Sequence, residues 1–258
     1  MKIKEITVDT AITYEDPPDG SHLPIIDPYD GCTVGCPYCW QLGDPTWNQS
    51  ILVKTNIAAL IRQQLREWPK DQVIFLGSRC DPYMTLEKTY GLTRSCIEAL
   101  DELGIDCMVT TKAGWGILLR DIDLLRSFRA KLTVLMGLSN LGQLKMASRS
   151  SLVQNIDLAN RLHQAGISVW AFITPILPGI TGVHEMIASL LPDIPVYLDR
   201  LRVEQGSLNG EKTLEFIAHH YPHLLPAYQA LVNGGADPYF ESLRADESIR
   251  LRAKWVFE

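Results

Sequence analysis

Short apolar segments alternate along the chain with longer segments whose apolar residues recur at helical spacing. A short run that is apolar throughout, such as Val73-Ile-Phe-Leu-Gly77, is typical of a parallel strand buried on both faces. Between these runs, apolar residues three and four positions apart indicate amphipathic helices. We predict strands at 73–77, 105–111, 132–139, 167–173 and 195–203, and helices near 56–68, 90–103, 120–129, 151–164 and 182–190.

Alternating strands and helices joined by short connections predict a parallel sheet with crossover helices. Together with an N-terminal strand, they make about six βα units, fewer than the eight of a closed barrel. We therefore expect an α/β fold, a partial (β/α)6 barrel with a parallel sheet. The expected organisation is an N-terminal lead-in at 1–28, the barrel at 29–206, and a helical or loop-rich C-terminal extension at 207–258 that covers the barrel mouth.

The composition is that of an ordinary globular protein, with 46% hydrophobic and 21% charged residues. No stretch approaches the ~20 apolar residues of a membrane span, and the first ten residues lack the apolar core of a signal peptide. Clustered cysteines without a leader favour a reducing cytoplasm and no membrane partner. The net charge of −6 argues against sequence-blind nucleic-acid binding, so a nucleic-acid partner is possible but not favoured.

Three of the six cysteines, Cys32, Cys36 and Cys39, form a Cys-x3-Cys-x2-Cys motif. Three thiolates so close together can ligate three corners of an iron–sulfur cubane and leave the fourth iron without a protein ligand. A structural zinc site normally needs four ligands, often two Cys-x2-Cys pairs, and the chain has no second pair. A disulfide framework is less consistent still with six cysteines in 258 residues.

This motif, with Tyr38 before its last cysteine, resembles the signature of the radical S-adenosylmethionine (radical SAM) superfamily, whose fold is an open six-stranded partial barrel. The resemblance implies that Cys32, Cys36 and Cys39 bind a 4Fe-4S cluster whose open iron chelates S-adenosyl-L-methionine. One electron then cleaves the cofactor to a 5′-deoxyadenosyl radical. The resemblance also implies that the Tyr38 backbone meets the adenine and that an electron donor, such as flavodoxin or ferredoxin, is a partner.

Polar residues that follow the predicted strands extend the resemblance, because the carboxyl ends of parallel strands form one mouth where ligands bind. Asp81-Pro-Tyr with Glu87 and Thr93-Arg94, Thr111-Lys112, and Pro175-Ile-Leu-Pro-Gly179 are similar to motifs of the spore photoproduct lyase-like branch. An Asp suits the ammonium group of the cofactor, and a Lys suits its carboxylate. By the resemblance, the cofactor-binding residues are Tyr38, Ser78, Cys80, Asp81, Lys112 and Ser139.

The chain also departs from that branch at two places. Ser78 stands where true spore photoproduct lyases have a hydrogen-donating cysteine, and Gln154 and Asn155 replace basic residues early in the helix after the fourth strand. No cysteine follows Cys107, so an auxiliary cluster is not expected. No catalytic residue is assigned.

Three functions remain open. The first is a radical SAM enzyme (a lyase, transferase or oxidoreductase) with one cluster and a small organic or nucleotide-like substrate. The second is a lyase, repair or activating enzyme that acts on DNA or protein. The third is a metal-binding scaffold without catalysis.

Overall fold

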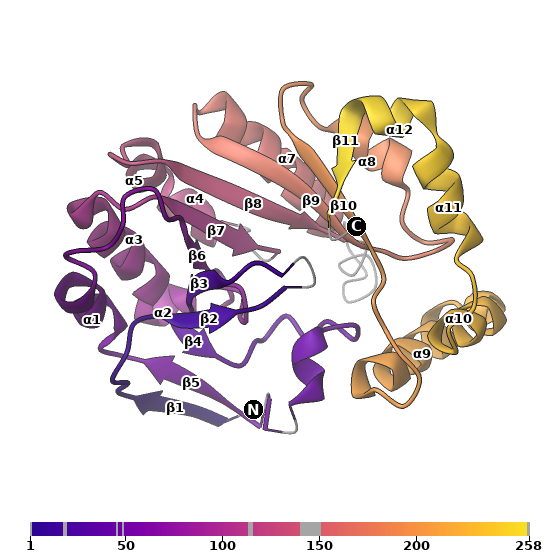
Figure 1. Ribbon diagram of the computed structural model, residues 1–258, viewed down its shortest axis with the longest axis horizontal. Helices are drawn as coiled ribbons and strands as arrows, with labels where there is room; N and C mark the ends of the chain where they lie inside the picture. The colour runs from indigo at the N-terminus through magenta and orange to yellow at the C-terminus, as the bar shows by residue number, and fades with distance from the viewer. Residues whose placement is uncertain are drawn as a thin grey trace.

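The computed structural model of the chain describes residues 2–17, 20–44, 46–47, 49–112, 116–139 and 151–256. Its centre is an eight-stranded sheet with the order β11-β10-β9-β8-β7-β6-β3-β2 (Figure 1). All neighbouring strands are parallel except β2, which pairs antiparallel with β3 at the edge. The strands are β2 (Thr13–Glu15), β3 (Leu23–Ile26), β6 (Ile74–Leu76), β7 (Cys107–Thr111), β8 (Leu132–Leu138), β9 (Ser168–Ile176), β10 (Val196–Arg200) and β11 (Ala253–Trp255).

Helices cover one face of this sheet, and this packing forms the main core. Along β7, β8 and β9 every second side chain is buried, the period that a strand imposes on its two faces. The buried side chains pack with apolar residues of the helices in one continuous cluster. These helices are α1 (Ile57–Gln64), α3 (Leu92–Leu103), α4 (Ile117–Arg120), α5 (Ile122–Arg126), α7 (Ser151–Gln164) and α8 (Val183–Ser189). The short helix α2 (Glu87–Tyr90) contributes Tyr90 to a separate apolar cluster around Tyr29.

The opposite face of the sheet, here called the inner face, is only half-buried. Its side chains alternate with the core residues along each strand. A closed barrel would fill this space with side chains. The open sheet leaves a largely apolar and aromatic surface whose members are Phe75, Met108, Leu135, Trp170, Phe172 and Tyr197.

A second, three-stranded sheet lies beside the first and was not predicted. It has the order β1-β5-β4, with β1 (Lys2–Ile6), β5 (Ser50–Lys54) and β4 (Tyr29–Asp30). Strand β1 runs parallel to β5, whereas β4 is antiparallel to it. Tyr29, Ile51 and Val53 of this small sheet pack against Cys80 and Met84, and thereby attach it to the loop after β6.

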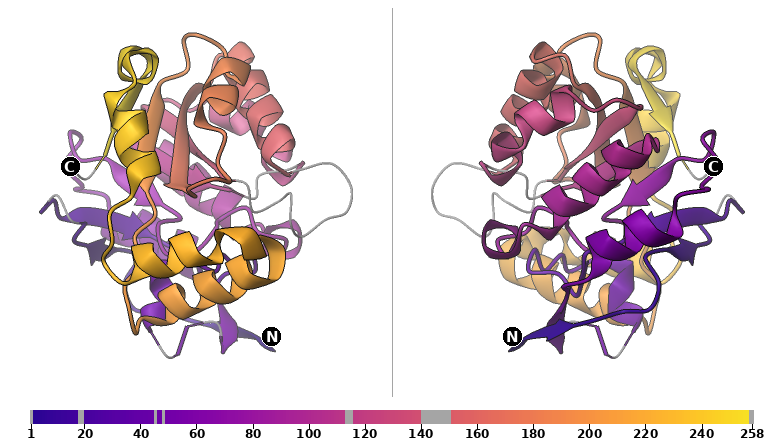
Figure 2. Two further views of the ribbon diagram at one scale, coloured as in Figure 1. Left: turned by 90° about the vertical axis from the view of Figure 1, so that its right-hand side faces the viewer. Right: turned by 90° about the vertical axis from the view of Figure 1, so that its left-hand side faces the viewer.

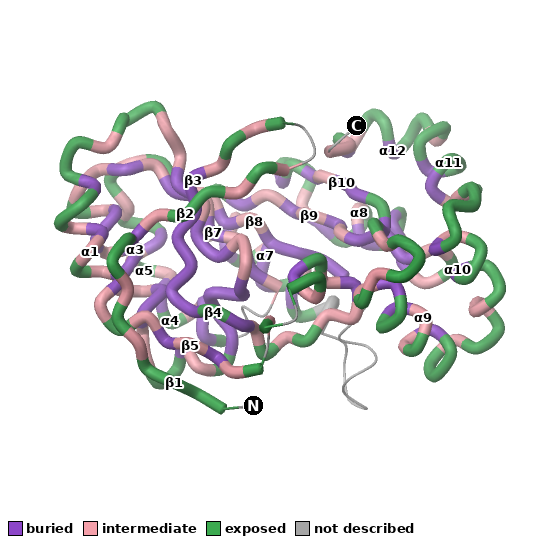
Figure 3. Tube along the Cα trace, turned by 60° about the horizontal axis from the view of Figure 1, so that its bottom comes forward, coloured by how far each residue is buried: buried purple, intermediate pink, exposed green. Residues whose placement is uncertain are grey.

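The C-terminal segment is helical, as expected, and adds one strand that was not expected. It contains α9 (Leu208–His220), the 3-10 turn η2 (Pro222–Leu224), α10 (Leu225–Val232), α11 (Pro238–Ala245) and α12 (Glu247–Arg252). Strand β11 then joins the large sheet beside β10. Helices α9 and α10 lie side by side below the sheet (Figure 2), and α9 to α12 expose much of their surface (Figure 3).

The fold class is confirmed, because strands β3 and β6 to β10 form the predicted open, parallel α/β sheet with crossover helices. The first barrel strand, β3, lies within the predicted lead-in at 1–28. Among the helices that the structure describes, none combines the length and the apolar character needed to cross a bilayer.

Candidate functional site

The three clustered cysteines lie on one loop between β4 and the 3-10 turn η1 (Trp40–Gly43). Gly31 and Gly35 have φ angles of +90° and +67°, in the left-handed region that favours glycine, and so let the loop turn tightly between bulky side chains. Cys32, Cys36 and Cys39 are half-buried, and none of the three is in a disulfide. The sequence motif therefore folds into a compact thiol-bearing loop, here called the cysteine loop (residues 31–39).

The surroundings of the thiols suit a bound cation. Burial, and then the negative charge of Asp81, raise the pKa of the Cys32 thiol to about 12. The backbone N–H groups of Val34 and Asp81 act in the opposite direction, because they donate toward this sulfur. Burial also raises the pKa of Cys39, while the Gln41 backbone N–H and the Lys112 charge lower it. A metal centre would stabilise these thiolates, since a metal-bound thiol is deprotonated.

The donor set fits a cluster better than a single ion. Among the described residues, no three His, Cys, Asp or Glu side chains converge closely enough to hold one metal ion. In a cubane each cysteine ligates a different iron, so the three sulfurs need not converge on one point. Cys36 nevertheless lies within electrostatic reach of both Cys32 and Cys39.

Asp81 is buried at the end of β6, where it joins two strand ends. Its Oδ1 accepts hydrogen bonds from the Tyr83 backbone N–H (3.0 Å) and the Thr111 hydroxyl (2.8 Å). Its Oδ2 accepts one from the Lys112 backbone N–H (2.7 Å). The carboxylate therefore fixes the ends of β6 and β7 relative to each other, beside Cys32.

Lys112 lies over β8 and reaches the cysteine loop. Its Nζ donates to the Thr174 carbonyl oxygen (3.0 Å) and lies 5.1 Å from the centroid of the Tyr38 ring. The side chain passes across Gly137, where an added Cβ would lie 2.4 Å from Lys112 Cγ. The Asn155 side-chain amide donates to the Lys112 carbonyl oxygen (2.6 Å). The structure thus brings together Lys112, Tyr38 and β9, and it gives Asn155 a role in holding the end of β7.

Tyr38 and Ser139 lie together beside this lysine. The Tyr38 hydroxyl is buried near the side chains of Ser139 and Cys36, and burial is the main cause of its raised pKa. The Tyr38 ring packs against the C-terminal extension, in a cluster with Leu177, Leu201, Ile217 and Tyr228. Tyr38 of the cysteine loop therefore belongs to one apolar cluster with residues of α9 and α10.

The predicted residues Ser78 and Cys80 have different surroundings. The Ser78 hydroxyl donates to the carboxylate of Glu15, from β2. The Cys80 side chain is buried in the apolar cluster with the small sheet. Its backbone N–H donates to Asp27 Oδ1 (3.2 Å), and Cys32 lies near its thiol. Asp27, which sequence reasoning missed, is thus a second carboxylate that joins strand ends.

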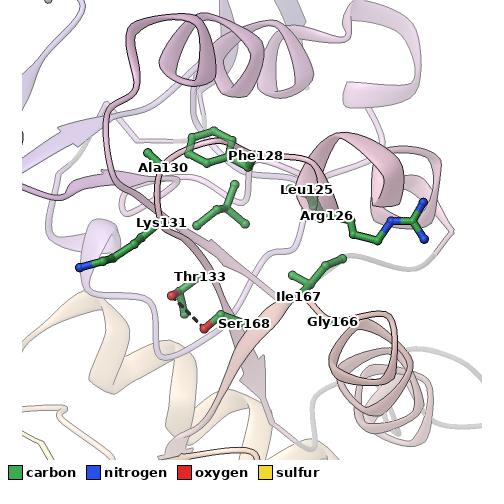
Figure 4. A pocket seen from close by; sticks show the side chains of 10 residues that line it. Leu125, Arg126, Phe128, Ala130, Lys131, Thr133, Gly166, Ile167 and Ser168 are labelled. Atoms are coloured by element: carbon green, nitrogen blue, oxygen red, sulfur yellow. Dashed lines mark hydrogen bonds between the residues drawn. The ribbon is translucent and has the colours of Figure 1, made fainter.

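A separate depression lies at the other end of the strands (Figure 4). It has a volume of about 320 Å³ and is lined by the first residues of β8 and β9, with Arg126, Phe128 and Lys131 at its rim. The Thr133 and Ser168 hydroxyls are 3.1 Å apart within it. Because β8 and β9 begin here, this depression is remote from Ser139 and Thr174 at their far ends and contains none of the predicted site residues.

Comparisons with known proteins bear on the fold of the chain. No family model matches the sequence. Uncharacterised proteins of Methanocaldococcus jannaschii (29% identical; 65% of this chain and 66% of the relative) and Mycobacterium tuberculosis (27%; 92% and 77%) are similar to it. A radical SAM Nalpha-GlyT isomerase of Pseudomonas phage M6 is 27% identical over 64% of this chain and 35% of its own. The chain thus spans about two thirds of the archaeal relative.

Solved structures with this fold are radical SAM proteins. Spore photoproduct lyase with bound AdoMet and dinucleoside spore photoproduct superposes with a TM-score of 0.54 (14% identity; 98% of this chain and 80% of that chain). SuiB of Streptococcus suis bound to S-adenosylmethionine gives 0.50 (15%; 76% and 48%). The chain therefore has the radical SAM fold, in the form found in spore photoproduct lyase, and the resemblance seen in its sequence is confirmed.

Proposed function

We propose that this chain is a radical SAM enzyme in which Cys32, Cys36 and Cys39 hold a 4Fe-4S cluster. The observation that carries the proposal is the cysteine loop itself, which presents three thiols outside any disulfide beside the strand-end residues Asp81 and Lys112. When bound, the cluster supplies one electron to the sulfonium of S-adenosyl-L-methionine. The protein holds both groups in place and excludes water.

The strand-end residues supply charges of both signs for the cofactor. Lys112 presents an ammonium group next to Tyr38, where a carboxylate can replace the Thr174 carbonyl oxygen as its partner. Asp81 holds the Lys112 backbone in place, because its carboxylate accepts the Lys112 backbone N–H. The negative charge of Asp81 also favours a nearby ammonium group. Tyr38, Ser78, Cys80 and Ser139 complete the proposed cofactor site.

The inner face favours a small organic or nucleotide-like substrate. Trp170 and Tyr197 lie with ring centroids 5.0 Å apart and an interplanar angle of 32°, and both are half-buried. Such rings can stack on a planar group, as aromatic side chains do with nucleobases. The net charge of −6 does not favour a long nucleic-acid strand. We propose that α9 and α10, which share an apolar cluster with Tyr38, close one side of this space.

We also propose that electrons arrive from a small carrier protein such as a flavodoxin or ferredoxin. Trp40 directly follows the last cluster cysteine and is 58% exposed, so the protein surface lies close to the proposed cluster. A short path from surface to cluster is what electron transfer from a docked carrier needs.

Cofactor cleavage tests the proposed function. The purified chain is reconstituted with iron and sulfide without oxygen, then mixed with dithionite and S-adenosyl-L-methionine. We expect 5′-deoxyadenosine in the wild type and none in Cys36→Ala. Cys107→Ala is the matched control, because Cys107 is buried in the main core and should not affect the reaction. A reconstituted wild type that never cleaves the cofactor would overturn the proposal.

A further inference from the structure

A hydrogen bond between two fully buried side chains anchors the start of the cysteine loop. The Tyr29 hydroxyl donates to Glu87 Oε2 at 2.5 Å, and neither residue is exposed. Tyr29 lies three residues before Cys32, in the short strand β4. Its ring crosses the apolar cluster between the small sheet and the loop after β6. The bond therefore joins the base of the cysteine loop to helix α2.

Both carboxylate oxygens of the buried Glu87 accept hydrogen bonds. Besides the Tyr29 hydroxyl, its Oε2 accepts the Thr93 backbone N–H (2.9 Å), and its Oε1 accepts Arg94 N–H (3.3 Å) and Arg120 Nη2 (3.0 Å). Burying a charge is costly unless it is paired and hydrogen-bonded, and here both oxygens are satisfied. The Glu87 side chain is thus held in one position and in turn holds the Tyr29 hydroxyl.

Glu87 belongs to a network of four charged side chains. Asp121, which is also fully buried, accepts from Arg94 Nη1 (2.9 Å) and from Arg120 Nε (2.8 Å). The two arginines and the two carboxylates alternate in sign, so each charge has partners of the opposite sign. The network connects α2, α3 and the α4–α5 corner. The start of the cysteine loop is therefore held in place by hydrogen bonds to the packed helices and not by neighbouring loops alone.

We infer that Tyr29 and Glu87 are positioning residues. They hold Cys32 in its place beside Asp81, so that the three thiols of the cysteine loop are already arranged before a metal centre binds. This inference rests on the proposed function for the identity of the bound cluster. The sequence motif Asp81-Pro-Tyr with Glu87 and Thr93-Arg94 then has two separate tasks. Asp81 fixes the ends of β6 and β7, whereas Glu87 fixes the entry to the cysteine loop.

The test removes one hydroxyl group and reads thiol reactivity in the metal-free chain. Tyr29→Phe keeps the ring in its apolar cluster but removes the bond to Glu87. Under reducing conditions, peptide mapping after iodoacetamide treatment should show that Cys32 is alkylated about tenfold faster than in the wild type, since hydrogen bonds to charged groups are among the stronger ones. Cys96 is fully buried in the main core and reports general loosening, so its rate should not change.

Tyr83→Phe is the matched control. Tyr83 is also fully buried, and its hydroxyl lies beside Asp121 in the same network, but it does not belong to the cysteine loop. In this variant the Cys32 rate should stay within about twofold of the wild type. After reconstitution, iron per chain should fall in Tyr29→Phe and not in Tyr83→Phe. If Tyr29→Phe does not fold, Glu87→Gln provides the same test, with the same expected direction.

An unchanged Cys32 rate in folded Tyr29→Phe would overturn the inference, and so would equal increases in Cys32 and Cys96. Because alkylation is read without metal, this result does not depend on cofactor cleavage. A faster Cys32 rate in a chain whose wild type binds no iron would leave the positioning role intact and remove the proposed function.

Discussion

At Gly137, one added methyl group should displace the Lys112 side chain while leaving Lys112 itself unchanged. In Gly137→Ala the new Cβ would lie 2.4 Å from Lys112 Cγ and 3.0 Å from Cε, far inside van der Waals contact. Because Cγ is near the root of the side chain, a small shift of the ammonium end cannot relieve the overlap. Lys112 must turn out of its place over β8 and give up the Thr174 carbonyl oxygen and the Tyr38 ring.

The size of the effect follows from those two contacts. A hydrogen bond from a charged donor contributes about 1.5–3 kcal/mol, and a cation–π contact about 0.5–2 kcal/mol. If Lys112 binds the cofactor carboxylate, Gly137→Ala should raise the Kd for S-adenosyl-L-methionine by at least about tenfold, which corresponds to about 1.4 kcal/mol. Isothermal titration calorimetry of the reconstituted protein measures it. Lys112→Met should produce a similar loss.

Gly43→Ala is the matched control for this prediction. Gly43 ends η1, close to the cysteine loop, but an added Cβ there meets nothing within 4 Å and the backbone is not in the left-handed region. Cofactor affinity should stay unchanged. Wild-type affinity in Gly137→Ala would refute the assignment of Lys112 to the cofactor site.

Three further predictions concern stability and ligand identity. Asp121→Asn removes the charge of a fully buried carboxylate that pairs with two partly exposed arginines, so the free energy of unfolding in urea should fall by about 1–3 kcal/mol. Burial raises the pKa of Asp27 to about 6 from its ordinary 3.8, so the folded state binds this proton more tightly than the unfolded state. The wild type should therefore lose about 2 kcal/mol relative to Asp27→Asn as the pH rises from about 4 to about 6, and urea titrations that show a constant difference would contradict this. Cys96→Ala should retain wild-type iron per chain, because this thiol is buried in the main core away from the cysteine loop.

The barrel strands could be predicted because they carry their own signal. Strands β7 and β8 are apolar runs whose buried positions are set by the core alone, and the structure ends them within two residues of the predicted limits. Strand β5 carries a weaker signal, since it has five residues and follows a turn-rich stretch. It forms by pairing with β1, with Lys2 opposite Ser50, and such distant pairings leave no local pattern.

Helix α1 begins at Ile57, beside its predicted start at 56, but ends at Gln64, four residues before the predicted end at 68. Asn56 precedes α1, but its side chain does not cap the helix. Its Oδ1 accepts from the Val8 backbone N–H (3.0 Å) and its Nδ2 donates to the Val8 carbonyl oxygen (2.8 Å). The predicted helix at 120–129 is divided at Asp121, whose buried carboxylate accepts hydrogen bonds from Arg94 and Arg120. Strand β11 escaped prediction because three residues are too few to show a periodic pattern.

Sequence patterns selected residues that the structure brings together, but not the contacts among them. The Cys-x3-Cys-x2-Cys spacing and the strand-end positions of Asp81 and Lys112 point to groups that lie close to one another, with Asp81 near Cys32 and Lys112 near Cys39. The crossing of Lys112 over Gly137 and the burial of Cys80 against the small sheet depend on elements far away in the sequence. The cofactor roles of Tyr38, Ser78, Cys80, Asp81, Lys112 and Ser139 stay predictions.

Metal analysis tests the central claim most directly. The chain is purified and reconstituted without oxygen, and iron, sulfide and zinc are measured per chain in the wild type and in Cys36→Ala. We expect about four irons with matching sulfide and an absorption near 400 nm in the wild type, and loss of both in the variant. One zinc per chain with no bound iron, or an iron content that Cys36→Ala does not change, would contradict the account.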